Sequence, residues 1–432
     1  MKKYLLLLVL IVVIFFLVQK FAFPEKTNYI FGGTLSPGKL IGFQYKNSEF
    51  LQEIIDDVSP LSIYDIKVDD IYNNGKNVVV AAISKAEYDA DHCLVKIYEP
   101  EENGYKISVL DELNEIFCRD LEIGDAYNKG ENVILLATHG EGMILAYRWD
   151  KKEKKWEKEI VMQNIVREID GNDLRRMTDK PLPYQTAVHT VEIADIDGDG
   201  KNEVIAAHGT ANTYKGEPES WVGIYRYIDG KWGKEIAGHI QGRQHRRLRI
   251  ANNVYGDGRT VIIAGTWPNS ILKSYQFKDN RWDERIIDDQ LLQDNNKGII
   301  AADLDRDGRD EIIVVTDPDG LVILYDFVGA DFTKTIIDKQ SESLKEETAG
   351  RIIGGFDALA FDIDDDGQEE LYIASVAIEP EKLTAGPRGY IGWVRSTSGF
   401  LFQYKKTPDG WERKILDQGP YWAIGAGKIW KK

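Results

Sequence analysis

One acidic motif, Asp-x-Asp-x-Asp-Gly-x-x-Glu, occurs three times and constrains the fold of this chain more than any other feature. The copies run from Asp195 to Glu203, from Asp303 to Glu311 and from Asp362 to Glu370. Each copy is followed at once by a short run of β-branched and aliphatic residues, which is typical of a buried strand. The motif therefore predicts a tight loop between two strands at three places.

The spacing of the carboxylates indicates a calcium site. Positions 1, 3, 5 and 9 are acidic and position 6 is glycine, and Ca²⁺ prefers such hard oxygen ligands on a sharply turning loop. An EF-hand would need Glu at position 12 and a following helix. Position 12 is Ala206, Val314 or Ile373, so the EF-hand is excluded. We expect about three Ca²⁺ ions with a structural role.

The acidic loop belongs to a longer repeat. Degenerate copies lie at Asp70–Gly75, Asp125–Gly130 and Asn253–Gly258, each again followed by a strand-like run. A second signature, an aromatic residue followed four positions later by Ile or Val, occurs seven times after a polar turn that predicts a hairpin. Four strands that recur roughly every 50–60 residues are typical of a propeller blade.

The chain contains seven outer hairpins but only six loops of either kind, and its two ends explain the difference. Tyr29–Thr34 resembles a strand that follows a loop, whereas Tyr421–Trp430 resembles a first strand with nothing after it. Pairing the two would close a ring and remove its free edges. We therefore predict an all-β fold, a seven-bladed β-propeller of four-stranded blades over residues 26–432, closed by pairing the C-terminal strand with the N-terminal blade.

The N-terminus predicts export. Lys2 and Lys3 precede an apolar run from Tyr4 to Val18, so residues 1–25 read as a signal anchor or a signal peptide. We favour an uncleaved transmembrane anchor that holds the propeller at the cell surface; a secreted protein is the alternative. The two cysteines, Cys93 and Cys118, favour a disulfide in an oxidising compartment, with two unpaired core residues as the alternative.

The net charge of −17 argues against nucleic acid and anionic membrane surfaces as partners. The only membrane contact that we expect is through the N-terminal segment. The remaining partner classes are a protein or a glycan.

The loop motif between paired strands resembles the FG-GAP/VCBS repeat propellers, the group that includes the integrin α-subunit head, and the resemblance covers everything after the N-terminal segment. It implies Ca²⁺ between the first and second strands of a blade, held by side chains 1, 3, 5 and 9 and by the carbonyl at 7. The implied ligands are Asp195, Asp197, Asp199, Lys201 and Glu203; Asp303, Asp305, Asp307, Arg309 and Glu311; and Asp362, Asp364, Asp366, Gln368 and Glu370. The degenerate loops have Tyr at position 3 and Val at position 9, so we expect no metal there.

The face opposite the acidic loops is the expected place for a ligand, because long loops on a rigid scaffold favour binding. It would receive the long segments 167–184, 211–221 and 377–395. It would also receive polar residues from the second to fourth repeats, which could bind a carboxylate or a uronic acid with an aromatic ring stacked on the sugar. These candidate ligand-binding residues are His139, His189, His208, His245, Arg246, Arg247 and Trp267.

Three functions remain open from the sequence, and the last of them is a surface scaffold that binds no small ligand. The first is a non-enzymatic, extracytoplasmic calcium-binding module for adhesion to a protein or a glycan. The alternative is a Ca²⁺-dependent polysaccharide lyase or hydratase whose base and charge-neutraliser come from the same face. Its residues would be His139, His189, His208, Arg246 and Arg247. No nucleophile elbow, phosphate-binding loop, dinucleotide fingerprint or zinc spacing is present.

Overall fold

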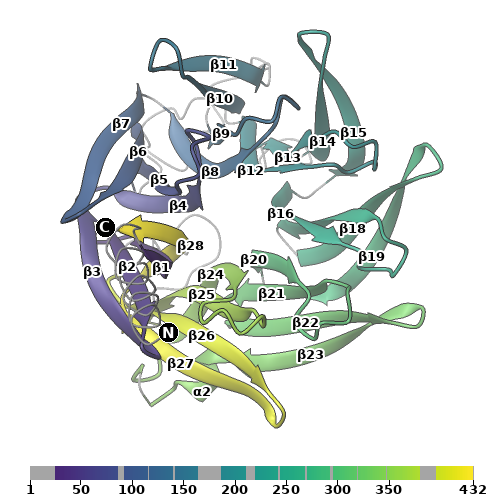
Figure 1. The fold of residues 1–432 in the computed structure, drawn as a ribbon. Helices are drawn as coiled ribbons and strands as arrows, with labels where there is room; N and C mark the ends of the chain where they lie inside the picture. Colours follow the sequence, from purple (N-terminus) through teal and green to yellow (C-terminus); the bar gives the residue numbers. More distant parts are fainter. Residues whose placement is uncertain are drawn as a thin grey trace, which may run out of the picture.

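The computed structural model describes residues 25–431 of the chain, apart from residues 86–91, 115, 140–141, 164–185, 211–218, 242–243, 268–269, 292–294, 319, 347 and 380–395. Seven four-stranded antiparallel sheets stand around a central axis (Figure 1). The prediction of an all-β, seven-bladed propeller with four-stranded blades is therefore confirmed.

We name the sheets blades A to G in chain order. For each blade the strands are given from the innermost, next to the axis, to the outermost. Blade A consists of β28 (Tyr421–Lys431), β1 (Glu25–Thr34), β2 (Lys39–Lys46) and β3 (Glu49–Asp57). Blade B consists of β4 (Ser62–Asp69), β5 (Val78–Ser84), β6 (His92–Glu101) and β7 (Gly104–Asn114). Blade C consists of β8 (Phe117–Gly124), β9 (Val133–His139), β10 (Met143–Asp150) and β11 (Lys155–Gln163). Blade D consists of β12 (Thr186–Ala194), β13 (Glu203–Thr210), β14 (Glu219–Ile228) and β15 (Lys231–Gln241).

Blade E consists of β16 (Gln244–Asn252), β17 (Thr260–Trp267), β18 (Ser270–Lys278) and β19 (Arg281–Leu291). Blade F consists of β20 (Asn295–Ala302), β21 (Glu311–Asp317), β22 (Leu321–Val328) and β23 (Asp331–Lys339), followed by the short helix α2 (Gln340–Ser343). Blade G consists of β24 (Ile352–Phe361), β25 (Glu370–Ile378), β26 (Gly399–Thr407) and β27 (Gly410–Gln418).

Blade A combines strands from both ends of the described chain. β28 pairs antiparallel with β1 in a register that runs from Glu25↔Lys431 to Gly33↔Ala423. Figure 1 shows β28, in yellow, beside β1, in purple. The innermost position in blade A is therefore filled by the last strand, whereas blades B to G each use four consecutive strands.

The repeated aromatic signature forms the outer tip of each hairpin. In five blades the aromatic residue of the fourth strand lies directly opposite an aromatic residue of the third strand, as in Tyr45↔Phe50 and Phe277↔Trp282, whose ring centroids are 5.2 Å apart in both cases. In blades B and G the opposite residue is Pro100 or Lys406. Such cross-strand aromatic pairs stabilise a sheet. In six blades the Ile or Val four residues later is exposed to solvent, and in blade G the corresponding Ile415 is half-buried, so the signature marks the outermost strand.

Each innermost strand carries a β-bulge at the same level. At the bulge, one residue of the innermost strand has no partner in the neighbouring strand. A bulge of this kind changes the direction in which a side chain points. The seven extra residues, one for each blade, define what we call the bulge ring: Tyr64, Arg119, His189, Arg246, Lys297, Phe356 and Trp422.

The residue that follows the bulge joins neighbouring blades. In three blades it is an aspartate whose carboxylate accepts a hydrogen bond from a backbone N–H of the next innermost strand. The pairs are Asp65 with Leu121 at 2.6 Å, Asp120 with Val191 at 2.9 Å and Asp357 with Ile424 at 3.1 Å. Because these carboxylates are buried, the bonds fix the positions of the blades relative to one another.

Cys93 and Cys118 form a disulfide, as predicted. It joins β6 of blade B to β8 of blade C, so the covalent link runs between neighbouring blades.

The predicted position at the cell surface needs correction. In the part of the chain that the structure describes, no helix is long and apolar enough to cross a membrane. Residues 1–24, on which the prediction of a helical anchor depended, lie outside the described residues. Segment 167–184 and most of segments 211–221 and 377–395 lie outside them as well.

Candidate functional site

The three acidic loops join the two innermost strands of blades D, F and G, as predicted. They connect β12 to β13, β20 to β21 and β24 to β25. In each loop, ligand atoms of three or four carboxylates lie within 4.8 Å of one another. The converging sets are Asp195, Asp197 and Asp199; Asp303, Asp305, Asp307 and Glu311; and Asp362, Asp364 and Glu370.

The backbone of each loop holds its first aspartate in place. In the blade F loop, the Asp303 carboxylate accepts hydrogen bonds from the N–H groups of Asp307 at 3.0 Å and Gly308 at 2.9 Å. Gly308 has φ of +86°, a left-handed conformation that glycine adopts without strain. The corresponding glycines, Gly200 and Gly367, have φ of +83° and +82°, so the three loops share one conformation.

The glutamate at position 9 is the buried member of each set. Glu203, Glu311 and Glu370 are at most 3% exposed, and each accepts a hydrogen bond from the N–H at position 2, for example from Leu304 at 2.9 Å in blade F. Burial, reinforced by the neighbouring aspartates, raises the pKa of Glu203 and of Glu311 to about 7. Buried carboxylates that repel one another in this way are stabilised by a nearby cation.

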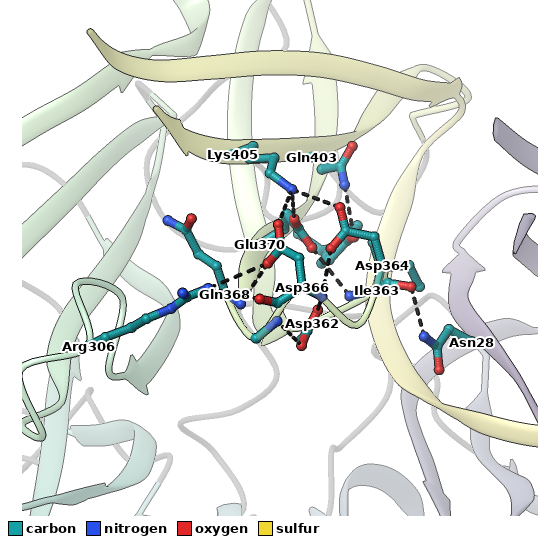
Figure 2. A network of polar contacts seen from close by, with 12 residues as sticks. Asn28, Arg306, Asp362, Ile363, Asp364, Asp366, Gln368, Glu370, Gln403 and Lys405 are labelled. Carbon is teal, nitrogen blue, oxygen red and sulfur yellow. Dashed lines mark hydrogen bonds and ion pairs between the residues drawn. The ribbon is translucent and has the colours of Figure 1, made fainter. Parts of the chain in front are cut away.

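In two loops the chain supplies such a cation itself. The Nζ of Lys405 lies 2.8 Å from Asp364, 3.0 Å from Asp366 and 2.8 Å from Glu370, so it contacts three carboxylates of the blade G loop (Figure 2). In blade D, the guanidinium of Arg226 lies 2.9 Å from Asp197 and 3.5 Å from Glu203. These basic groups stand where a metal cation would be bound, so the donor sets fit a cation.

Blade F differs from the other two. Arg226 and Lys405 each follow a buried tyrosine of the third strand, and the residue at the same place in blade F is Asp326. Asp326 adds negative charge beside Glu311 and contributes to the rise in the pKa of Glu311. Arg309 pairs with Asp307 from within the loop. The chemistry of the donor set therefore fits a divalent cation best in blade F.

The degenerate loops keep the turn but lack the carboxylates at positions 3 and 9, where they carry Tyr and Val. The side chains of Asp125 and Asn253 each accept a 2.6 Å hydrogen bond from the N–H of the glycine at position 6. The tyrosines at position 3 turn to other partners, as Tyr127 does to Glu159 at 3.0 Å. Their inability to bind metal stays a prediction.

On the opposite side, the structure brings together part of the predicted ligand-binding group. His139 ends β9 and His189 is the bulge-ring residue of blade D; His139 Nε2 lies 3.1 Å from His189 Nδ1. Burial, together with the positive charges of Arg119 and Arg246, lowers the pKa of both histidines well below its ordinary value. Both imidazoles are therefore neutral at pH 7.

Two other predicted histidines lie apart from this pair. His208 Nε2 is 2.8 Å from the hydroxyl of Tyr225, and His245 lies between Ser220 at 2.7 Å and the hydroxyl of Tyr275 at 2.9 Å. Both histidines are fully buried. These contacts are those of core residues that connect strands of blades D and E.

Three predicted candidates remain. Arg246 is the bulge-ring residue of blade E and lies next to Arg247 in β16. Arg247 reaches Asp120 at 3.6 Å and the carbonyl of Phe356 at 3.2 Å, so it links the innermost strands of blades C, E and G. Trp267 is the last residue of β17, and its side chain lies outside the part of the structure that is described.

The residues on the axis were missed by the sequence analysis. The innermost strands surround a cavity of about 360 Å³. Its charged wall holds two ion pairs, Lys67 with Glu122 at 2.8 Å and Arg249 with Glu192 at 2.7 Å. Burial raises the pKa of Glu192 to about 7. These residues come from four successive blades, so only the closed ring brings them together.

Arg119 is the other residue that was missed. The sequence contains a pattern that could have identified Arg119. Tyr64, Arg119 and His189 each lie six residues before the first position of an acidic or degenerate loop. Aligning the repeats at this position would have grouped Arg119 with His189.

The fold and the loops define a seven-bladed propeller with acidic inter-strand loops, and comparison with known proteins adds the following. The sequence matches no protein-family model and no curated protein. Among solved structures, the chain is similar to an Agrocybe aegerita lectin described as specifically recognising non-reducing terminal N-acetylglucosamine, with 13% identity, a TM-score of 0.52 and coverage of 94% of this chain and 96% of the lectin. It is also similar to Saccharomyces cerevisiae Sqt1, with 11% identity, a TM-score of 0.48 and coverage of 91% and 86%. At these identities the likeness concerns the fold alone.

Proposed function

We propose that this protein is a calcium-binding β-propeller of the FG-GAP/VCBS type that acts as a binding module for a glycan or protein ligand. The observation that carries the metal part is the convergence of Asp303, Asp305, Asp307 and Glu311 within 4.8 Å in the blade F loop. Two sibling loops of the same conformation hold basic side chains among their carboxylates. The position-7 carbonyls of Lys201, Arg309 and Gln368 would complete the three sites.

The ion would have a structural role. A bound Ca²⁺ supplies positive charge that relieves the repulsion among the loop carboxylates. Because each loop joins the two innermost strands of a blade, the ion would stabilise the part of the blade closest to the axis. At ten times its Kd one ion adds about 1.4 kcal/mol to the free energy of unfolding.

The proposal of a ligand-binding role rests on the rigid propeller and on the face opposite the acidic loops. Seven rigid sheets present the ends of their inner strands together, an arrangement on which ligand sites are commonly built. The same architecture occurs in the lectin described above. A glycan is therefore the first ligand class to test, and a protein is the second.

The metal proposal is tested by thermal unfolding of the full chain in Ca²⁺ and in EGTA. We expect Ca²⁺ to raise the midpoint of thermal unfolding. Asp305→Ala should reduce this increase by the contribution of the blade F site, and Asp197→Ala and Asp364→Ala should reduce it by less. Asp331→Ala is the matched control, because Asp331 is an exposed aspartate of the same blade whose side chain is 93% accessible. Identical wild-type midpoints in Ca²⁺ and EGTA would refute the metal assignment.

The binding proposal is tested by applying the labelled full chain to an array of neutral, amino and acidic glycans. Binding to a defined glycan class supports a glycan ligand. An array on which no glycan exceeds the background rules that class out and leaves the protein ligand to be tested.

A further inference from the structure

The bulge ring has a basic sector in three adjacent blades. Arg119, His189 and Arg246 are the extra residues of β8, β12 and β16. These strands are neighbours, because Asp120 bonds to Val191 and the hydroxyl of Thr190 donates to the carbonyl of Arg246 at 3.1 Å. A bulge at the same level in each strand thus directs three basic side chains to one region.

The histidine pair leaves one polar atom unsatisfied in this sector. His139 Nε2 and His189 Nδ1 share one hydrogen bond at 3.1 Å. His189 is only 5% exposed, and its Nε2 is buried without a hydrogen-bond partner among the residues that the structure describes. If His139 donates, the neutral His189 carries its proton on Nε2. A buried N–H of this kind, beside Arg119 and Arg246, calls for an acceptor from a ligand.

Aromatic rings continue from the histidine pair. The ring of Phe117 lies 5.5 Å from that of His139 and 4.5 Å from that of Tyr64. Phe117, His139 and Arg246 are half-buried, whereas Tyr64 and Arg119 are buried. The cluster therefore reaches the surface through an aromatic ring, an imidazole and a guanidinium.

We propose that this cluster, formed by Arg119, His139, His189, Arg246 and Phe117, is a subsite for the carboxylate-bearing ring of a hexuronic acid. The carboxylate accepts a hydrogen bond from His189 Nε2 and lies within the field of Arg119 and Arg246, and the sugar ring packs against Phe117. The inference rests on the proposed function and deepens it, because it names the glycan class.

The chemistry favours an acidic sugar over a neutral one. A hydrogen bond from a donor to a carboxylate is roughly twice as strong as one to a neutral hydroxyl. The two neighbouring guanidinium groups also favour an anion, and their attraction is strengthened beside the buried Arg119 and His189. Aromatic faces bind the apolar face of a sugar but do not distinguish acidic sugars from neutral ones, so selectivity comes from His189 and the arginines.

Calorimetric titration of the full chain with D-glucuronate, D-glucose and sodium sulfate tests the proposal. We expect glucuronate to bind, glucose not to bind, and sulfate to bind more weakly than glucuronate. His189→Gln and Arg246→Gln should weaken glucuronate binding by about tenfold or more. Arg413→Gln is the matched control, because Arg413 pairs with Asp338 at 2.8 Å on the outer strands; it should bind as the wild type does.

Several outcomes would overturn the proposal. If glucose binds as tightly as glucuronate, the carboxylate is not what the site recognises. If sulfate binds as tightly as glucuronate, the sugar ring contributes nothing to binding. If His189→Gln binds glucuronate as tightly as the wild type does, His189 does not contact the ligand. If glucuronate does not bind but the array shows binding of neutral glycans, the subsite is wrong while the proposed function stands.

A spectroscopic test does not depend on whether the variants fold. The chain has six histidines, so selective ¹⁵N labelling of imidazoles gives a small set of signals. Glucuronate should shift the Nε2 signal of His189 and raise the pKa of this ring, which faces His139, Arg119, Arg246 and Arg247. Perturbation of other histidines only, for example His208 and His245, would place the ligand elsewhere.

Discussion

At the scale of single residues, one position decides how an acidic loop balances its charge. The residue after the buried third-strand tyrosine is Arg226 in blade D, Asp326 in blade F and Lys405 in blade G. A basic side chain there neutralises the carboxylates from inside the chain, whereas an aspartate increases their need for an external cation. We therefore expect the three loops, although they share one motif, to differ in their affinity for Ca²⁺, with the blade F loop binding most tightly.

Lys405→Met should raise the Ca²⁺ affinity of the blade G loop by about tenfold or more, because the ion no longer competes with an ammonium group. In EGTA the variant should be less stable than the wild type by about 1–3 kcal/mol, because Glu370 loses its counter-charge. Calcium titration by calorimetry and unfolding in Ca²⁺ and EGTA measure the two effects. Lys334→Met, which removes a lysine paired with Asp288, is the control. An unchanged titration of Lys405→Met would contradict the expectation.

Gly298 is a second residue whose identity is set by its surroundings. It follows the bulge in β20, and a Cβ there would lie 3.1 Å from the backbone nitrogen of Ala358. Gly298→Ala should lower the free energy of unfolding by roughly 1–3 kcal/mol, the usual effect of overpacking. Gly233→Ala, whose Cβ would meet nothing closer than 3.8 Å, should have little effect. Equal stability of the two variants in urea unfolding would refute this account.

At the scale of the elements, the blades are joined by hydrogen bonds at the bulges and by one covalent bond. The carboxylates that follow the bulges bond to the next innermost strand near the axis. The disulfide joins β6 to β8 and so ties blade B to blade C. The contacts between blades therefore contribute to stability together with the hairpins within them.

Replacing both cysteines by alanine should lower the free energy of unfolding by about 3 kcal/mol, as expected for a bridge that closes a loop of this length. The two cysteines are separated by 25 residues in the sequence. Urea unfolding of the oxidised wild type, the reduced wild type and the variant measures the effect. Reduction should bring the wild type close to the variant and leave the variant unchanged. Coincident curves for oxidised and reduced wild type would rule out a stabilising bridge.

At the scale of the whole molecule, buried charges on the axis connect blades that are not neighbours. Arg249 lies 2.7 Å from Glu192 of blade D and 3.8 Å from Asp357 of blade G. Burial, with the nearby Asp120 carboxylate, raises the pKa of Asp65 to about 8. Between about pH 4 and pH 8 the folded chain therefore holds a proton that the unfolded chain has released.

This proton makes stability depend on pH. A raised folded-state pKa of a carboxyl group means that its stabilising effect is present at low pH and is lost as the pH rises through the folded value. The free energy of unfolding should fall between pH 6 and pH 8.5, by at most about 1.4 kcal/mol for each pH unit and group. Asp65→Asn should reduce this slope, because the amide still accepts the hydrogen bond but does not titrate.

The comparison of wild type with Asp65→Asn cancels the contribution of the loop glutamates, whose raised pKa values are common to both proteins. Thermal unfolding across this range measures the slopes, and Asp331→Asn, a change at an exposed site, should follow the wild type. Parallel curves for the wild type and Asp65→Asn would refute the assignment of the proton to Asp65.

The sequence by itself determined the seven blades and the position of the acidic loops. Both are encoded locally: the alternation and turns of a blade recur along the chain, and the five positions of a loop lie within nine residues. The even number of cysteines in an exported chain favoured a disulfide between Cys93 and Cys118 but did not identify its place between two blades.

Only the tertiary structure decided which distant side chains meet. His139 and His189 come from different blades, Lys405 reaches its loop from the third strand, and Arg249 spans the axis. A bulge shifts the side-chain alternation of a strand by one residue, which the hydrophobic pattern does not reveal. The Lys405 contact forms within blade G, and the His139–His189 contact depends on the packing of two neighbouring blades and on the bulge in β12. The contact of Arg249 with Asp357 joins blades E and G across the axis, so it depends on the closed ring.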